Sequence, residues 1–234
     1  ALLSKRLPIG VEETIESIDC QLMKHFYDAW YRPENMILVM VGDFDPKMAE
    51  DLIKEKFSDL APRGPERPAP NLGRVNHQGL KPFYHYEQEA GDASVSIEVV
   101  ETILEKPDSI ASRIQMLKKD VADAIVQNRL ENLLRKPDAP FADASIGTSV
   151  LLDCFFYSEI SAQSSPDKWE DAMAAIEQEL RRALTFGFED SELERVKKDF
   201  IAELETDVQK ASTRSTRHLA RQIIRNVNSN RVFM

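Results

Sequence analysis

Four stretches beyond residue 80 place apolar or aromatic side chains in the short-period pattern of β-strands. Residues 83–89 and 94–99 alternate strictly, and residues 144–152 and 155–162 are two further strand-like runs. Successive side chains of a strand point to opposite faces of its sheet, so the alternation predicts strands with one covered face.

Apolar residues recur at helical spacing between and after these strands. A long helix is predicted to open at Pro107-Asp108-Ser109 and to end before Lys136-Pro137. A second helix follows Ser165-Pro166 and stops at Gly187, because glycine readily takes the left-handed conformation that closes helices. A third starts at Asp190, and its apolar stripe is interrupted at residues 210–216.

The order strand, strand, helix, strand, strand, helix, helix predicts an α+β fold. Helices should pack on one face of an antiparallel, or mixed, sheet. Residues 61–79 contain four Pro, three Gly and few apolar residues, which is typical of a linker. We therefore expect a first section at residues 1–60, a linker at 61–79 and a second α+β domain at 80–234 that is itself truncated.

The first section has a different pattern. A helix from Ser17 to Tyr31 is expected to stop before Pro33, because proline biases the preceding residue away from helix. The run from Met36 to Val41 has no polar interruption and predicts a central strand that is buried on both faces. Asp45-Pro46 should then cap a helix that ends near Leu60.

The aromatic residues of this section are expected in its core. Phe26 and Trp30 fall on one face of the first helix, and the second helix is expected to bury Met48, Leu52, Ile53 and Phe57.

These residues resemble a known family. The stretches LPIGVEETI from Leu7, FYDAWYRPENM from Phe26 and ILVMVGDFDP from Ile37 are similar to the insulinase, pitrilysin and mitochondrial-processing-peptidase family of zinc peptidases. The close match covers about residues 6–60, and beyond it the order of elements is similar. The resemblance implies that residues 1–60 are the closing helix–strand–helix unit of a preceding catalytic-type domain.

The zinc motif of that family is missing from this chain. The family carries H-x-x-E-H on a helix with a distal Glu, upstream of the LPIG stretch, and the motif Glu activates the metal-bound water. The chain has four His (His25, His77, His85 and His218), none in that motif. We therefore predict no catalytic, cofactor-binding or metal-binding residues and no cofactor in this chain, with zinc in the parent protein.

Charge and composition exclude two other classes. The net charge of −10 and the pI near 5.0 argue against nucleic-acid binding, which requires a basic surface. No apolar run approaches the ~20 residues that span a bilayer. The two cysteines, Cys20 and Cys154, are interpreted as free apolar thiols, with a disulfide left open.

Several polar groups invite a functional interpretation, but each has a structural one that we favour. Asp43 and Asp45 suit a turn and a helix cap, and His85 suits a packed or rim position. The serines Ser145, Ser149 and Ser158 lack the G-x-S-x-G context of a hydrolase. One set is acidic and suits a solvated sheet face: Glu87, Glu89, Glu98 and Glu101. Another set is basic and suits a solvated helix face, or a contact with an acidic partner: Arg214, Arg217, Arg221, Arg225 and Arg231.

The function predicted from the resemblance is a non-catalytic section of an insulinase-like zinc metallopeptidase. It would support the catalytic domain of the same polypeptide and line a chamber that degrades peptides. The alternative is a structural or assembly subunit, or a peptide-binding module, of a relative that lacks the zinc site. The compartment is open between the bacterial periplasm and the cytoplasm.

One structural hypothesis follows from the order of elements. The second domain lacks a closing unit of its own, so its sheet should have an unprotected edge. We expect the strand at 36–41 to dock on the sheet of residues 82–162, within the chain or exchanged in a homodimer.

Overall fold

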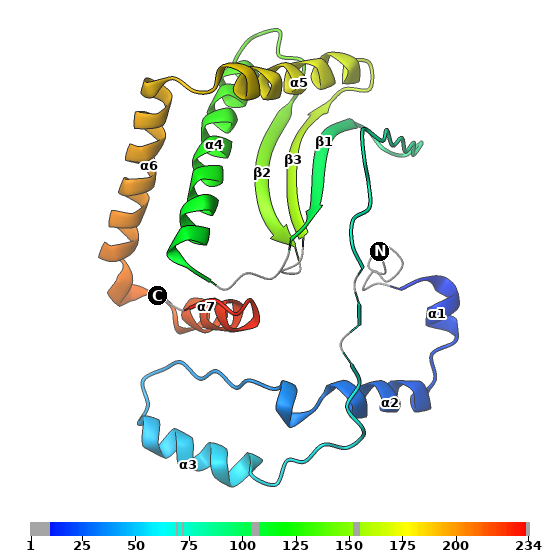
Figure 1. Ribbon diagram of the computed structural model, residues 1–234, viewed down its shortest axis with the longest axis vertical. Helices are drawn as coiled ribbons and strands as arrows, with labels where there is room; N and C mark the ends of the chain where they lie inside the picture. The colour runs from blue at the N-terminus through cyan, green and yellow to red at the C-terminus, as the bar shows by residue number, and fades with distance from the viewer. Residues whose placement is uncertain (1–9, 69, 72, 104–107, 152–154, 233–234) are drawn as a thin grey trace. The chain divides into compact units, whose positions relative to one another are not determined.

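The computed structural model describes residues 10–68, 70–71, 73–103, 108–151 and 155–232 (Figure 1). The described chain divides into two compact units. Unit 1 holds residues 10–74 and 214–228, and unit 2 holds residues 75–213 and 229–232. The limits expected from the sequence, 1–60, 61–79 and 80–234, stay a prediction.

Unit 2 is built on a three-stranded antiparallel sheet. Its strands are β1 (Ala93–Thr102), β2 (Asp143–Leu151) and β3 (Phe155–Ser164), in the order β1-β3-β2. The register places Ile97 opposite Ile160 and Ile146 opposite Ile160, so one face of the sheet is apolar across all three strands. This confirms the three strands predicted at 94–99, 144–152 and 155–162, apart from residue 152, which lies outside the described residues.

Three helices accompany the sheet. They are α4 (Ile110–Leu134), α5 (Trp169–Phe186) and α6 (Asp190–Gln209). Helices α4 and α5 contact the strands, and α6 contacts α4. The core between helices and sheet consists of Val95, Val126, Leu130, Phe141, Ala144, Ile160, Ala162, Ala172 and Ile176. The predicted α+β class, with helices packed on an antiparallel sheet, is confirmed.

The helix ends follow local chemistry. Ser109 caps α4, because its hydroxyl accepts from the backbone N–H of Ser112 and Ser112 returns a bond to Ser109. Gly187 follows α5 with φ 71°, as predicted for a helix-closing glycine. Helix α5 begins at Trp169, three residues after Pro166, and the break expected at 210–216 separates α6 from α7 (Thr216–Asn228).

Unit 1 contains α1 (Glu12–Glu16), α2 (Cys20–Trp30), the 3-10 turn η2 (Pro33–Asn35), α3 (Pro46–Phe57) and α7. The single helix predicted from Ser17 is wrong at its start. Ser17 ends α1, and Asp19 caps α2 by accepting from the backbone N–H of Leu22. Aspartate is at least as good an N-cap as serine, so the later residue starts the helix. The cap at Asp45 and the Pro46 start are confirmed.

The strand predicted at residues 36–41 does not form in this chain. The segment has no ladder, although Met36 has the extended backbone of a strand, with φ −101° and ψ 136°. Docking of this segment on the sheet of residues 82–162, within the chain or exchanged in a homodimer, stays a prediction. A strand exists only through hydrogen bonds to a neighbour, and the described part of unit 1 contains no other strand.

The expected core of unit 1 is also corrected. Trp30 is only half-buried, and the Phe26 side chain is 51% exposed. Four apolar side chains of α3 were expected to be buried. Ile53 is half-buried, and Met48, Leu52 and Phe57 are exposed. The helical stripes are present, but the described part of unit 1 offers no sheet to cover them.

The remaining strand prediction, residues 83–89, is wrong as well. The segment carries no ladder, and Phe83 and Tyr84 are 91% and 88% exposed. Alternation alone cannot make a strand, because the backbone groups need a partner.

Candidate functional site

Side chains between Phe26 and Met36 hold neighbouring segments of the chain against the end of α2. Arg32 is buried, and its guanidinium donates to the carbonyl oxygen of Gly64 and, at 3.1 Å, to Glu34. The amide of Asn35 donates to the carbonyl oxygen of Trp30 at 3.2 Å and so holds the turn after the helix. These side chains fix a helix end and a connecting segment, which is a structural use of the run.

Aromatic stacking adds to this arrangement. The rings of Tyr27 and Tyr31 stack with their centroids 4.7 Å apart, and the guanidinium of Arg63 lies 4.8 Å from the Tyr27 centroid. A cation over an aromatic face is attracted by the ring quadrupole. Arg32 and Arg63 therefore hold the beginning of the predicted linker against α2.

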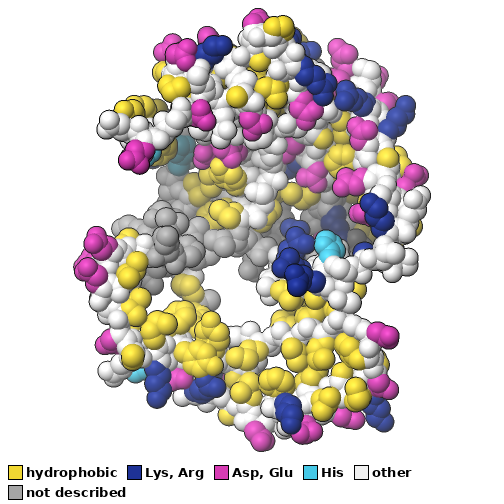
Figure 2. All heavy atoms as spheres, turned by 180° about the vertical axis from the view of Figure 1, so that it is seen from behind, with side chains coloured by type: hydrophobic (Ala, Val, Ile, Leu, Met, Phe, Trp, Pro, Cys, Tyr) yellow, Lys and Arg dark blue, Asp and Glu magenta, His cyan; other side chains and the backbone are white. Residues whose placement is uncertain are grey.

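Unit 1 exposes an unusual amount of apolar surface, seen as yellow patches in Figure 2. Ile37 is 64% and Leu38 56% exposed, and they lie in a segment that the sequence marks for complete burial. Further exposed members are Leu22, Met23, Phe26, Met36, Met40, Met48, Leu52 and Phe57. We call this set the unit 1 apolar surface. A contiguous exposed apolar patch usually marks an interaction site.

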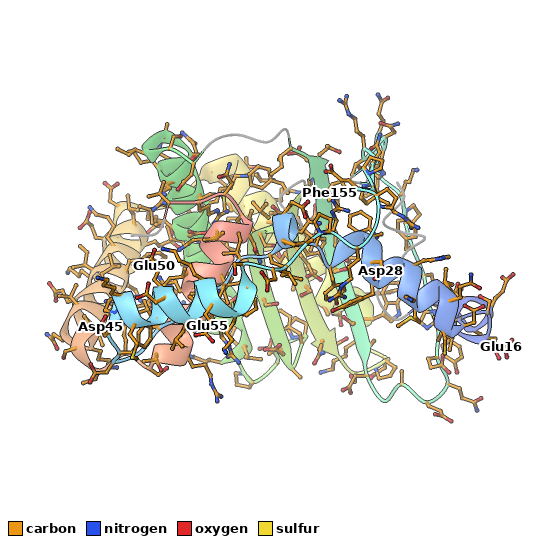
Figure 3. The ribbon with its side chains drawn as sticks, turned by 90° about the horizontal axis from the view of Figure 1, so that it is seen from below. Glu16, Asp28, Asp45, Glu50, Glu55 and Phe155 are labelled. Carbon is orange, nitrogen blue, oxygen red and sulfur yellow. The ribbon has the colours of Figure 1, made fainter. Side chains whose placement is uncertain are left out.

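The carboxylates of unit 1 do not form a metal site. Asp45 Oδ1 accepts from the backbone N–H of Lys47 and Met48, as expected of a cap, and Asp43 is exposed. Figure 3 shows Asp45, Glu50 and Glu55 spread along α3. Within the described residues, no three His, Cys, Asp or Glu side chains are grouped closely enough to hold a metal ion.

The polar groups weighed in unit 2 are also dispersed. His85 is almost fully exposed, and its Nε2 lies 3.8 Å from Glu87. Ser145 and Ser158 bond other hydroxyls of neighbouring strands, at Ser161 and Thr148. The other residues considered are exposed: Glu87, Glu89, Glu98, Glu101, Ser149, Arg214, Arg217, Arg221, Arg225, Arg231 and Cys20. Cys154 lies outside the described residues.

The face of the sheet away from the core carries carboxylates beside the aromatic side chains of Phe155 and Tyr157. Glu98 and Glu159 stand directly opposite on β1 and β3. Burial, the hydrogen bond to Glu159 and the charges of both carboxylates raise the pKa of Tyr157 to about 12. Like charges directly opposite on neighbouring strands destabilise a sheet slightly, so this face is acidic but contains no acid–base pair with opposed pKa shifts.

Sequence reasoning missed an ion pair between two helices. Arg129 of α4 donates from Nε and Nη2 to the two carboxylate oxygens of Glu192 of α6, each at 2.6 Å. Its Nη2 also donates to the carbonyl oxygen of Gly187 at 3.2 Å. The hydrogen bonds from Arg129 lower the pKa of Glu192 to about 2. An arginine at an otherwise apolar helix position is the only signal that the sequence offers for this pair.

A second such contact joins distant parts of unit 2. Asp108, just before α4, accepts from Arg113 Nε at 2.8 Å and from the backbone N–H of Val232 at 3.0 Å. Arg113 also donates to the carbonyl oxygen of Val232 at 2.8 Å. The bond from Arg113 lowers the pKa of Asp108 to about 2. These pairs stabilise the fold and show no arrangement for catalysis.

Comparison with known proteins gives a consistent family. Residues 17–200 match the family model described as "Peptidase M16 inactive domain". The chain is 31% identical over 150 residues to "Zinc protease PQQL-like" of Arabidopsis thaliana, covering 64% of this chain and 16% of that protein. It is 23% identical over 231 residues to "Probable zinc protease PqqL" of Escherichia coli K12, covering 98% of this chain and 24% of that protein.

A solved structure shares the fold. The crystal structure of the periplasmic protease PqqL from Escherichia coli matches with a TM-score of 0.81 and 21% identity, over 98% of this chain and 25% of that one. The chain thus spans about a quarter or less of the length of these relatives. Among the described residues, no helix is long and apolar enough to cross a membrane.

Proposed function

Because the chain belongs to the peptidase M16 inactive-domain family, we propose that it is the supporting section of a larger zinc metallopeptidase. In this proposal the zinc-binding segment of the parent protein precedes residue 1. Residues 1–60 complete a catalytic-type domain, and residues 80–234 form a second domain that lines a peptide-degrading chamber. Peptides are then the substrates of the parent protein, and zinc is its cofactor.

The unit 1 apolar surface is the observation that carries this proposal. Leu38 and Ile37 are exposed, although they lie in a segment with the composition of a strand buried on both faces. Exposing such a segment to water is unfavourable, at about 25 cal/mol for each Å² of apolar surface. A sheet contributed by a preceding domain would cover it and supply the missing ladder.

The proposal is tested first by the residues encoded before Ala1. They are expected to contain H-x-x-E-H and a distal Glu. The longer polypeptide should cleave an unstructured peptide, and a chelator should abolish the cleavage. A Glu-to-Gln change in that motif is the control, because it removes the general base and spares the fold.

The opposite result would favour another class. If the longer polypeptide has no such motif and no chelator-sensitive cleavage, the parent is a structural or assembly subunit, or a peptide-binding module. We further propose a periplasmic location, supported by the periplasmic protease PqqL that shares its fold. Fractionation of cells that express the parent protein tests it, and recovery with the cytoplasmic marker would contradict it.

A further inference from the structure

The C-terminal part of the chain carries a charge opposite to that of the rest. Residues 208–234 contain no Asp or Glu and six Lys or Arg, so their net charge is +6, whereas the whole chain has a net charge of −10 and the preceding residues therefore carry −16. Helix α7 occupies much of this basic segment, and its sequence TRHLARQIIRNVN includes no acidic residue. A concentration of like charge in one segment is typical of an interaction surface.

Three arginines form one stripe along α7. Arg217, Arg221 and Arg225 follow one another at intervals of four residues, so they lie on one side of the helix, about 6 Å apart along its axis. We call these three side chains the arginine ladder. All three residues are exposed, whereas the apolar residues Leu219 and Ile223 are half-buried. The ladder is therefore the part of α7 that is open to solvent.

The arginine ladder has no counter-charge in the part of the chain that the structure describes. On other helices, exposed basic side chains pair with a carboxylate four residues away, as Lys54 does with Glu50 and Arg181 with Glu177. Helix α7 contains no such carboxylate, and no side-chain hydrogen bond or ion pair joins a ladder arginine to another described residue. Three guanidinium groups are thus available to one anionic partner.

The spacing of the ladder matches an extended acidic peptide. Side chains at alternate positions of an extended chain point to one side and recur about every 6.6 Å, close to the rise of about 6 Å between ladder arginines. Each guanidinium can hold a carboxylate through two parallel hydrogen bonds, and arginine clusters recognise acidic motifs in this way. An anionic membrane suits α7 less well, because a membrane-bound helix buries its apolar side in lipid, and Leu219 and Ile223 are already half-buried.

We propose that the arginine ladder of α7 is a docking site for peptide segments that carry carboxylates at alternate positions. Its contacts are exposed ion pairs, so each one is weak and is screened by salt. In the parent protein the ladder holds acidic stretches of peptide substrates. That step rests on the proposed function, whereas peptide binding by the chain itself does not.

Titration of the full chain with a peptide tests the site. The chain is labelled with nitrogen-15, and its amide signals are followed at low ionic strength. The probe is a seven-residue peptide with glutamate at its second, fourth and sixth positions and threonine elsewhere. Signals of residues 216–228 should move. A control peptide of the same composition has glutamate at its first, second and last positions. It should bind about threefold more weakly, because its carboxylates cannot reach all three arginines together.

Single substitutions separate the ladder from the overall charge. Arg221→Ala removes the central arginine and should weaken binding about two- to fivefold. Alanine is the best helix former, so α7 is retained, and unchanged signals from unit 2 show that the variant is folded. Arg181→Ala is the matched control, because it removes an exposed arginine from α5 and changes the net charge equally. It should leave the affinity unchanged. At about 1 M salt, where the Debye length is about 3 Å, the shifts should disappear.

Five outcomes would overturn the proposal. They are unmoved signals from residues 216–228, equal affinity for the two peptides, and equal weakening by Arg221→Ala and Arg181→Ala. The others are a salt-sensitive dimer that Arg221→Ala dissociates, which would show that a second copy covers the ladder, and tighter binding to phosphatidylglycerol vesicles than to the peptide. None of these measurements involves zinc or cleavage, so failure of this proposal is distinguishable from failure of the proposed function.

Discussion

Single residues determine how the helices of unit 2 hold together. Arg129 is buried, and its bidentate contact with Glu192 links α4 to α6. A buried ion pair adds little compared with an apolar contact, but removing one partner leaves an uncompensated charge. The pair therefore matters most when it is broken.

Glu192→Gln is expected to lower the free energy of unfolding by about 2 kcal/mol, because buried Arg129 loses its counter-charge. Urea denaturation measures the change. Glu194→Gln on the same helix is the matched control: its pair with Lys197 is about half exposed on both sides, so its loss should cost much less than the loss of the Arg129 pair. Equal costs would show that the Arg129 pair is no stronger than a surface pair.

The pH dependence follows from the same carboxylates. The pKa values of Glu192 and Asp108 are both lowered to about 2 by their arginine partners. A carboxyl group with a lowered folded-state pKa contributes stability above its unfolded pKa and loses it as the pH falls toward the folded value.

We therefore expect stability to be steady near neutral pH and to fall between about pH 4.5 and pH 2. Urea midpoints measured across this range should show a shallower decline in Glu192→Gln than in the unsubstituted chain. A decline that is just as steep in the variant would assign the acid sensitivity to other groups.

At the scale of elements, caps and registers decide where helices and strands begin. Ser109 starts α4 through its reciprocal bonds with Ser112. Ser109→Ala should reduce stability by about 1 kcal/mol, the usual cost of losing an N-cap. Ser191→Ala is the control, because Ser191 is exposed in the first turn of α6 and does not cap it. If Ser109→Ala lowers the stability less than Ser191→Ala does, the Ser109 side chain is not needed to cap α4.

The segment at 36–41 is expected to behave differently in the chain and in the proposed parent protein. Leu38→Asp should change the stability of the chain by less than about 0.5 kcal/mol, because Leu38 is already exposed. In the longer polypeptide it should cost more than about 3 kcal/mol, because an aspartate would enter a sheet interior without a partner. Chemical denaturation of both polypeptides measures this, and similar small costs would refute burial by a preceding domain.

At the scale of the whole molecule, the chain is expected to be inactive by itself. A catalytic zinc needs three protein ligands and a bound water, and H-x-x-E-H is absent from the sequence. Incubation of the purified chain with an unstructured peptide and excess zinc should give no cleavage. Cleavage that copurifies with the chain and is abolished by a chelator would contradict this prediction.

Much of unit 2 could be predicted from the sequence, because local chemistry agrees there with the final fold. Alternation placed β1, two strand-like runs placed β2 and β3, and the signals at Ser109 and Gly187 placed one end each of α4 and α5. The motifs around Phe26 and Pro33 indicate the family by themselves. The absence of a zinc motif is likewise a property of the sequence alone.

The tertiary structure decided which apolar segments found a partner. Residues 36–41 and 83–89 have the pattern of strands, yet neither forms a ladder, because a strand also needs a hydrogen-bonding neighbour, which a local pattern does not supply. Phe26 and Trp30 carry a correct helical stripe with no sheet to cover it. The contact of Arg129 with Glu192 joins residues that are 63 positions apart in the sequence. Hydrophobic periodicity indicates which face of an element a residue occupies, but it does not indicate what packs against that face.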